Sequence, residues 1–280
     1  MAAIIASSLL AAPSLASTRG PLGQYGPGDH TVTMTVGGVV RSLLLHVPPN
    51  PAVNQRPLLL IYHGHGDTAQ STAAGTDFEA VSNSTGEVVA FLQGINKHWN
   101  DEAHGTSSTE PSDVAFTAAA ITTLERVVAF DHKRIIAVGF SNGALMVEDL
   151  GCRLAGKLEM VVPIEGELAV TTSAHCAPAR PLSVYEIHGT ADTAIPYGGG
   201  QFGGSHGPVV LSAPKSAARW AQLDHCAKTP KSTYPSKSVK LTTYSRCRNR
   251  VAVTLRTIFG GVHEWGSGVG LIVYGALPPA

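Results

Sequence analysis

Residues 134–146 read RIIAVGFSNGALM, and this stretch decides the fold that we expect. Residues 134–138 form a largely β-branched, apolar run, which predicts a buried strand. Residues 142–155 have helix-forming composition with apolar residues at Leu145, Leu150 and Leu154. Between them stands a G-x-S-x-G turn with Ser141 at its centre, the pattern of a nucleophile elbow. Gly139 and Gly143 fit this turn, because residues two positions from the serine press on neighbouring backbone.

The bare pattern is not specific, because it occurs twice in this chain. Gly203-Gly204-Ser205-His206-Gly207 matches it too, inside a glycine-rich run with no strand before it and no helix after it. We interpret this second match as a loop. For Ser141 the alternative is an ordinary strand–helix turn with a capping serine, so the rest of the chain must supply its partners.

Composition places limits on the class of protein. The chain has 280 residues, a formal net charge of zero, 14% charged and 44% hydrophobic residues. That length suggests one large domain or two small ones, and the hydrophobic content is ample for a core. Neutrality gives no reason to expect nucleic acid or an anionic membrane as a partner. No apolar run reaches the roughly 18 residues that a membrane-spanning helix needs.

The first sixteen residues, MAAIIASSLLAAPSLA, are similar to a secretory signal peptide. They contain a short apolar region and the small-x-small end Ser14-Leu15-Ala16, although a positive start is missing. We therefore expect a secreted protein, extracellular or periplasmic, with residues 1–16 as signal peptide. The alternative is a disordered tail rich in alanine and serine.

Four cysteines, spread along the chain, are an even number that fits two disulfides in an exported protein. They form no C-x-x-C, which argues against a zinc or redox site. Three pairings are possible. The sequential one, Cys152–Cys176 and Cys226–Cys247, closes the shortest loops and is the one we favour; four buried free thiols are the alternative.

Strand and helix patterns alternate along the chain. A hairpin is expected at 29–48, and strands at 56–62, 87–92, 159–164, 181–187, 238–245 and 250–259; helices are expected at 78–84, 111–130 and 212–226. Such alternation predicts an α/β protein with a mostly parallel central sheet and helices on both faces. No linker or repeat interrupts it, so we predict a single catalytic domain over residues 29–280.

Polar residues that could partner Ser141 follow the later strands. Asp192 lies after the strand at 181–187, and His263 lies after the last strand, which gives the order Ser141, Asp192, His263 of an α/β-hydrolase triad. Glu165, one strand earlier, is the rival acid, and closing an Asx-turn is the alternative role for Asp192. Asp113, near a helix start, is expected to cap or brace a loop.

The loop His63-Gly64-His65-Gly66 follows a buried strand, the place where such a fold supplies an oxyanion donor. We predict the backbone N–H groups of His65 and Asn142 as the two donors. The alternative is a turn with packed imidazoles, and a metal site is disfavoured because no third ligand is near in the sequence. Trp99 and Trp265 are candidates for the substrate cleft, although packing under a loop explains Trp99 equally well.

These motifs, together with His188-Gly189-Thr190-Ala191-Asp192 followed by Pro196-Tyr197, and Gly261-Val262-His263-Glu264-Trp265, resemble a known family. They look like the secreted feruloyl esterases, acetylxylan esterases and polyhydroxybutyrate-depolymerase-like esterases of carbohydrate esterase family 1, over residues 40–268. The resemblance implies an α/β-hydrolase fold with Ser141 as nucleophile, Asp192 as acid and His263 as base, and it supports the sequential disulfides. The closing helix of that family is reduced here to 267–280, which looks too short and glycine-rich.

The function expected from the sequence is that of a secreted serine esterase without metal or cofactor. Two-step hydrolysis through an acyl-enzyme would act on feruloyl or acetyl esters of plant polysaccharide. The alternatives are hydrolysis of polyhydroxybutyrate-type polyester or oligomers, another hydrolase such as a peptidase, and a non-hydrolytic acyltransferase or ligand-binding relative. We expect a monomer whose partner is the ester substrate.

Overall fold

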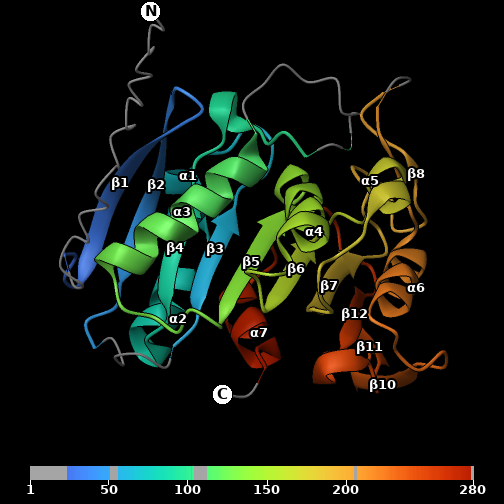
Figure 1. Ribbon diagram of the computed structural model, residues 1–280. Coiled ribbons are helices and arrows are strands. Elements are labelled where there is room, and N and C mark those ends of the chain that lie inside the picture. Colours follow the sequence, from blue (N-terminus) through green and yellow to red (C-terminus); the bar gives the residue numbers. More distant parts are fainter. Residues whose placement is uncertain (1–23, 51–55, 102, 104–111, 205–206, 279–280) are drawn as a thin grey trace, which may run out of the picture.

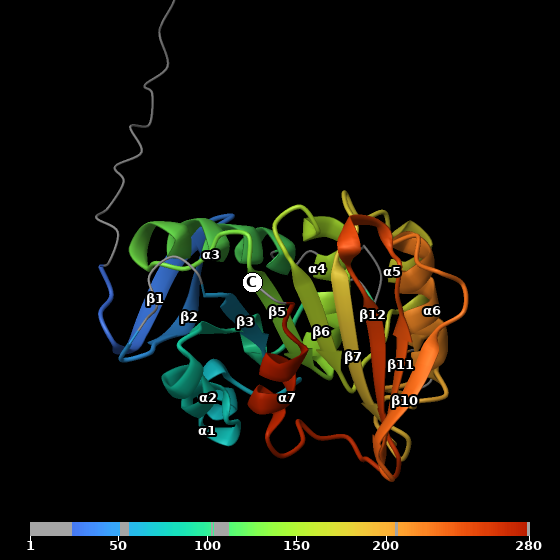
Figure 2. The same cartoon turned by 90° about the horizontal axis from the view of Figure 1, so that it is seen from below.

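A computed structural model describes residues 24–50, 56–101, 103, 112–204 and 207–278. Its centre is a ten-stranded sheet in the order β1-β2-β4-β3-β5-β6-β7-β12-β11-β10 (Figures 1 and 2). The six strands from β4 to β12 in this order are parallel to one another. They are β3 (Leu58–Tyr62), β4 (Val88–Leu92), β5 (Ile135–Phe140), β6 (Met160–Ile164), β7 (Ser183–Gly189) and β12 (Val253–Ile258). The predicted fold class is confirmed for this central part.

Antiparallel strands extend the sheet at both edges. The predicted hairpin is present as β1 (Gly28–Val36) and β2 (Val39–Val47), and its β2 pairs with β4 at one edge. At the other edge β11 (Val239–Tyr244) pairs with β12, and β10 (Lys231–Ser236) pairs with β11. The sheet is therefore mixed, with its parallel strands in the middle. A separate small sheet consists of β8 (Gly200–Gln201) and β9 (Val209–Val210).

Helices cover both faces of the sheet. Figure 2 shows α3 (Asp113–Val127), α4 (Asn142–Leu154), α5 (Val170–His175) and α6 (Ala213–Leu223) on one face, with α1 (Ala69–Gly75), α2 (Phe78–Thr85) and α7 (Val269–Ala276) on the other. Side chains alternate along β3, so Leu58, Leu60 and Tyr62 pack into the first core and Leu59 and Ile61 into the second. The wholly buried central strands explain the continuous apolar runs in the sequence.

The carboxyl ends of the parallel strands meet at one edge of the sheet. β5, β6, β7 and β12 are successive neighbours, so the residues that follow them come together although they are far apart in the chain. In open parallel sheets this edge is where ligands bind. The three candidate residues Ser141, Asp192 and His263 follow β5, β7 and β12 in turn.

The C-terminal stretch differs from our expectation, because it does form a helix. α7 spans Val269–Ala276, and its Val269 and Val273 are buried in the second core. The backbone N–H of Gly270 donates to Asp77 Oδ1 at 2.6 Å, so the carboxylate of the residue just before α2 caps α7. This tertiary cap compensates for the poor helix propensity of the glycines.

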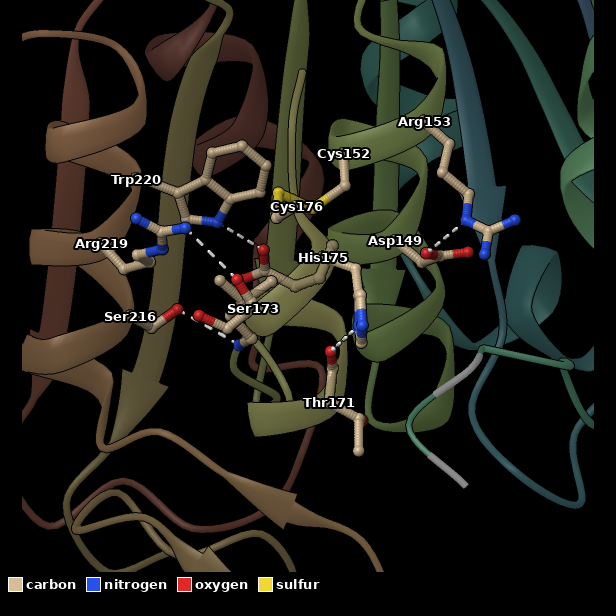
Figure 3. The surroundings of a disulfide bond; sticks show 12 residues. Asp149, Cys152, Arg153, Thr171, Ser173, His175, Cys176, Ser216, Arg219 and Trp220 are labelled. Atoms are coloured by element: carbon tan, nitrogen blue, oxygen red, sulfur yellow. Dashed lines mark hydrogen bonds and ion pairs between the residues drawn. A yellow bond between two sulfur atoms is a disulfide. The ribbon is translucent and has the colours of Figure 1, made fainter. Parts of the chain in front are cut away.

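Both disulfides of the sequential pairing are present, Cys152–Cys176 and Cys226–Cys247. Figure 3 shows Cys152 on α4 joined to Cys176 just after α5, beside Trp220 of α6. This bridge is buried, whereas Cys226 and Cys247 are partly exposed. The first bridge therefore ties α4 to the loop after β6, and the second ties α6 to the edge hairpin.

Several expectations fall on residues that the structure does not describe. The proposed signal peptide at 1–16 and the second G-x-S-x-G serine, Ser205, lie outside the described residues. Within the described ranges no helix has the length and apolar character needed to cross a membrane. The short helices α1 and α5 and the edge strand β10 were not predicted.

Candidate active site

Ser141 occupies the turn between β5 and α4, the context that the sequence predicted. Its φ is 56° and its ψ −120°, a backbone conformation that costs a residue with a side chain about 1–3 kcal/mol. A Cβ on Gly139 would lie 2.0 Å from Gly143 O, and one on Gly143 would lie 2.3 Å from Tyr62 O. Both positions therefore require glycine, because the turn is pressed between its own helix and β3.

His263 lies between Ser141 and Asp192. Its Nδ1 donates to Asp192 Oδ2 at 2.7 Å, and its Nε2 is 2.9 Å from Ser141 Oγ, within range to accept the hydroxyl proton. A carboxylate at Nδ1 fixes the neutral tautomer that leaves Nε2 free to act as a base. The loops after β5, β7 and β12 thus bring the three predicted residues into one hydrogen-bonded line.

Asp192 is held as a carboxylate by several donors. Its Oδ1 accepts from the backbone N–H groups of Ala194 at 2.7 Å and Ile195 at 2.9 Å, so the Asx-turn alternative is also realised. Burial alone would raise the pKa of Asp192, but donors on His188 and His263 hold that pKa below its usual range. The carboxylate is therefore available to orient His263 at neutral pH.

Glu165, the rival acid, does not contact His263 in this way. Both of its carboxyl oxygens are 3.0 Å from the backbone N–H of Gly189, and Oε2 lies 3.3 Å from His188 Nε2. Burial raises the pKa of Glu165 to about 8. It supports the turn that carries Asp192, and Asp192 is the carboxylate that meets His263.

The loop predicted to supply an oxyanion donor leaves β3 beside Ser141. β3 pairs with β5 so that Tyr62 lies opposite Gly139, which places the His63–Gly66 turn next to the elbow. His63 is buried; its Nδ1 donates to Gly64 O at 2.8 Å, and its Nε2 accepts from Gly94 N at 3.0 Å. Burial lowers the pKa of His63, so this imidazole is neutral and packed. The N–H groups of His65 and Asn142 stay the predicted donors.

The sequence left two interpretations of Trp99, a residue of the substrate cleft and a residue packed under a loop. Only 2% of it is exposed, its Nε1 donates to His63 O at 2.8 Å, and its ring packs on those of Tyr62 and His63. This burial contradicts a place on the cleft surface and supports the packing alternative. Trp99 instead braces the turn that carries His65 from below.

The side chain of Asn142 has a role that the sequence did not reveal. Its Oδ1 accepts from Trp99 N at 2.7 Å, and its Nδ2 donates to Trp99 O at 3.1 Å and to Asp101 Oδ2 at 2.6 Å. The first residue of α4 is thereby bonded to the loop after β4. An amide at a helix start next to the nucleophile was the available clue, because an amide side chain offers two donor hydrogens and an acceptor oxygen together.

Trp265, the second cleft candidate, is partly exposed and packs beside the triad residues. Its ring centre lies 5.2 Å from that of Phe140 and 5.9 Å from that of Phe78. The Phe140 ring is in turn 4.8 Å from the His263 ring. Phe140 and Trp265 thus form an aromatic wall beside His263. Phe140 directly precedes Ser141 in the chain, and Trp265 is the more exposed of the two rings.

Asp113 braces a loop, as predicted. It pairs with the buried Arg41, and its Oδ2 accepts from Asn100 N at 2.8 Å. The Arg41 guanidinium lies 3.9 Å above the Phe116 ring centre. Asp113 therefore fixes the start of the loop that also carries Asp101.

Two groups of described residues bring metal-ligand atoms within 4.8 Å of one another: Asp29, His46 and Glu79, and Glu165, His188 and Asp192. In the first, His46 Nδ1 is 2.6 Å from Asp29 Oδ1 and Nε2 is 3.0 Å from Asn83 Oδ1. In the second, both His188 nitrogens also face acceptors. In both groups the imidazole nitrogens already face hydrogen-bond acceptors, so hydrogen bonds and ion pairs account for these contacts.

The strand order, the elbow and the hydrogen-bonded Ser141, His263 and Asp192 define the class of protein: an α/β hydrolase. The chain belongs to the phospholipase/carboxylesterase family, whose model matches residues 48–203. That membership places it among the carboxylic-ester hydrolases.

Individual relatives agree with this class. The chain is 31% identical over 220 residues to feruloyl esterase B of Piromyces equi, which is 76% of this chain and 40% of that protein. It is 26% identical over 160 residues to the bifunctional acetylxylan esterase/xylanase XynS20E of Neocallimastix patriciarum, which is 57% of this chain and 22% of that protein. The chain thus spans less than half the length of these two relatives.

Among solved structures, the acetyl xylan esterase from Aspergillus awamori has the same fold. The TM-score is 0.63 at 14% identity, over 84% of this chain and 94% of that one. At this identity the likeness concerns the fold alone. The relatives confirm the resemblance to feruloyl and acetylxylan esterases, and the polyhydroxybutyrate branch stays a prediction.

Proposed function

We propose that this protein is a serine esterase that hydrolyses carboxylic esters through an acyl-enzyme on Ser141. One observation carries the proposal: Ser141 Oγ, His263 and Asp192 form a continuous line of hydrogen bonds of 2.9 and 2.7 Å. In this arrangement a serine hydroxyl becomes nucleophilic, because the imidazole takes its proton as the carbonyl is attacked.

The first half-reaction forms the acyl-enzyme. His263 Nε2 takes the hydroxyl proton while Ser141 Oγ bonds to the carbonyl carbon, and Asp192 stabilises the resulting imidazolium. The backbone N–H groups of His65 and Asn142 bind the oxyanion, each contributing about 3 kcal/mol. The start of α4 adds the positive end of a helix dipole. His263 then gives its proton to the leaving alcohol as the ester C–O bond breaks.

The second half-reaction reverses these roles with water. His263 removes a proton from a water molecule that attacks the acyl carbon, and the Ser141 oxygen leaves with that proton. The products are the free acid and the original serine. Every proton is moved by one imidazole, so no cofactor is required.

The substrate that we propose is an ester of plant polysaccharide, with a feruloyl or acetyl acyl group. The names of feruloyl esterase B and of the acetylxylan esterase/xylanase support this class. The partly exposed Trp265, which packs on Phe140 next to His263, would offer an aromatic acyl group a ring to contact.

Two substitutions test the nucleophile. Ser141→Ala is expected to reduce hydrolysis of p-nitrophenyl acetate by about 10⁶-fold and to abolish labelling by a fluorophosphonate probe. Ser205→Ala, at the centre of the second G-x-S-x-G, is the matched control and should retain both. Appreciable activity in Ser141→Ala would contradict the proposal, and a dead Ser205→Ala would move the nucleophile to that site.

A substrate panel tests the acyl group. We expect methyl ferulate or acetylated xylan to be cleaved in preference to hydroxybutyrate oligomers. A preference for the oligomers would favour a polyester hydrolase. Ester products formed with an added alcohol or sugar would favour acyl transfer.

We also propose that the protein is exported. Two disulfides in the structure support an oxidising compartment, and residues 1–16 would serve as the signal. N-terminal sequencing of protein recovered from the producing cells should begin after Ala16. Recovery of intact, reduced protein from the cytosol would contradict export.

A further inference from the structure

A buried histidine lies directly behind the carboxylate of Asp192. His188 is the penultimate residue of β7 and is 1% exposed. Its Nε2 is 3.3 Å from Asp192 Oδ2, the same oxygen that accepts from His263. An imidazole on β7 and one in the loop after β12 therefore share one carboxylate oxygen.

Both nitrogens of His188 face acceptors. Nδ1 pairs with Glu167 Oε1, and Nε2 is 3.0 Å from Ile195 O and 3.3 Å from Glu165 Oε2. A neutral imidazole donates from one nitrogen and accepts at the other. A carboxyl group lies at each nitrogen, and an imidazolium is the state that offers a proton to both sides, so the geometry favours an imidazolium.

We propose that His188 is a positioning residue for the triad, a permanent buried imidazolium that fixes Asp192 as an ionised carboxylate in the orientation that His263 needs. The proposal rests on the proposed function of Ser141, His263 and Asp192. Oδ1 is held by the N–H groups of Ala194 and Ile195 and Oδ2 by His263, and His188 adds an ion-pair partner at 3.3 Å behind the same carboxylate.

The surrounding charges support this assignment. Carboxyl groups face His188 from the loop after β6, from β7 itself and from the loop after β7; they are Glu165 and Glu167, Glu186, and Asp192 in that order, with Tyr197 packed edge-on. Burial alone would lower the pKa of His188, but hydrogen bonds to Asp192 and Glu167 raise it to about 10. Burial raises the pKa of Glu167 to about 7 and that of Glu165 to about 8. Of these carboxyls, Asp192 is the one whose negative charge is favoured.

The strained backbone of Glu165 also supports the proposal for His188. Glu165 follows β6 with a φ of 52°, in the left-handed region that a residue with a side chain rarely adopts. In this conformation its N–H donates to Ile187 O at 2.9 Å while its carboxyl group meets Gly189 N. The strained turn thus brings Glu165 and Glu167 to the His188 ring, and such strain persists where the surrounding structure fixes it.

The first experiment observes the protonation state of His188 in the unaltered protein. The full chain is labelled with ¹⁵N-histidine, and the His188 ring is assigned by the signals absent from His188→Asn or displaced in Glu167→Gln. We expect both ring nitrogens to stay protonated from about pH 5.5 to 8.5. A ring that titrates near pH 6.5, or a neutral ring at pH 7.5, would overturn the proposal.

The second experiment measures the effect on catalysis. His188→Asn is expected to lower kcat for p-nitrophenyl acetate about tenfold or more with KM within twofold, because positioning acts on the transition state. Loss of a nearby positive charge should also move the acid limb of kcat/KM upward by about half a pH unit. His132→Asn, on an exposed residue, is the matched control and should change neither.

Glu167→Gln keeps the test decisive if His188→Asn does not fold. It replaces the carboxylate at Nδ1 with an amide oxygen, so the His188 ring should start to release its proton below about pH 9, with a smaller fall in kcat. A folded variant of either residue with unchanged kcat and acid limb would refute the positioning role. An active Ser141→Ala would instead refute the proposed function and leave the protonation result standing.

Discussion

A buried carboxyl group on α4 gives a quantitative prediction for the pH dependence of stability. Glu148 is 1% exposed; its Oε2 accepts from Trp220 Nε1 at 2.5 Å, and among the described residues its Oε1 has no hydrogen-bond partner. Burial raises the pKa of Glu148 to about 8 from an ordinary value of 4.5. Folded protein therefore retains a proton that unfolded protein has already lost.

The sign follows from this difference. Between about pH 4.5 and 8, unfolding releases the Glu148 proton, so the free energy of unfolding falls as the pH rises. One proton corresponds to about 1.4 kcal/mol per pH unit, which amounts to roughly 5 kcal/mol over the whole interval. Glu167, whose pKa is about 7, acts in the same direction. We expect the protein to be most stable in mild acid.

The variant Glu148→Gln removes this titration and keeps an acceptor for Trp220. Urea unfolding at pH 5, 6, 7 and 8, followed by circular dichroism, gives the slope of unfolding free energy against pH. We expect that slope to be shallower by about 1.4 kcal/mol per unit than in the unaltered protein. Glu125→Gln, on the partly exposed face of α3, is the control. Parallel slopes for Glu148→Gln and the unaltered protein would refute the reasoning.

Three further outcomes follow from the structure. Asp192→Asn should lower kcat about 10⁴-fold, because an amide favours the wrong tautomer of the catalytic imidazole; a loss below tenfold would contradict the assignment. Gly143→Ala should destabilise the protein by several kcal/mol, about the cost of overpacking, since the new Cβ would lie 2.3 Å from Tyr62 O; an unchanged melting temperature would show that the elbow is looser than described. The partly exposed Cys226–Cys247 bridge should be reduced and alkylated before the buried one, at a cost of about 3 kcal/mol, with mass spectrometry of the alkylated peptides as readout; simultaneous loss of both bridges would contradict this order.

The central strands and large helices could be predicted from sequence because burial on both faces leaves an unmistakable pattern. β3, β4, β5 and β6 are fully buried over their whole lengths and appear as continuous apolar runs. β10 reads KSTYPS and is exposed at every position, so no apolar periodicity marks it. Its pairing with β11, with a register shift between Thr233 and Ser236, is what makes it a strand.

α7 was missed for a different reason. Its sequence, VGLIVYGA, contains two glycines and no capping side chain of its own. The cap comes from Asp77, which is 193 positions away from Gly270 in the chain. Local propensity cannot report a partner at that distance, and the burial of Val269 and Val273 in the second core supplies the remaining stabilisation.

The order of residues was sufficient to bring Ser141, Asp192 and His263 together, because parallel strands expose their following loops at one edge. Order alone did not decide between Asp192 and Glu165, since both follow parallel strands whose carboxyl ends lie at the same edge of the sheet. The structure separates them by their donors. Asp192 receives two backbone N–H groups and two imidazoles, whereas the Glu165 carboxyl group meets one backbone N–H and the edge of His188.

That difference in donors is also a difference in charge. A buried carboxyl group remains ionised only if hydrogen bonds and opposite charge outweigh the loss of water, and it keeps its proton otherwise. The donors around Asp192 keep it ionised, whereas burial keeps the proton on Glu165, as the opposite directions of their pKa shifts indicate. His188 lies between these two acids, which follow neighbouring strands. In our proposal its positive charge keeps Asp192 ionised, while Glu165 keeps its proton. In this protein the triad carboxylate is distinguished from its rival less by its place in the chain than by the positive charge that we propose behind it.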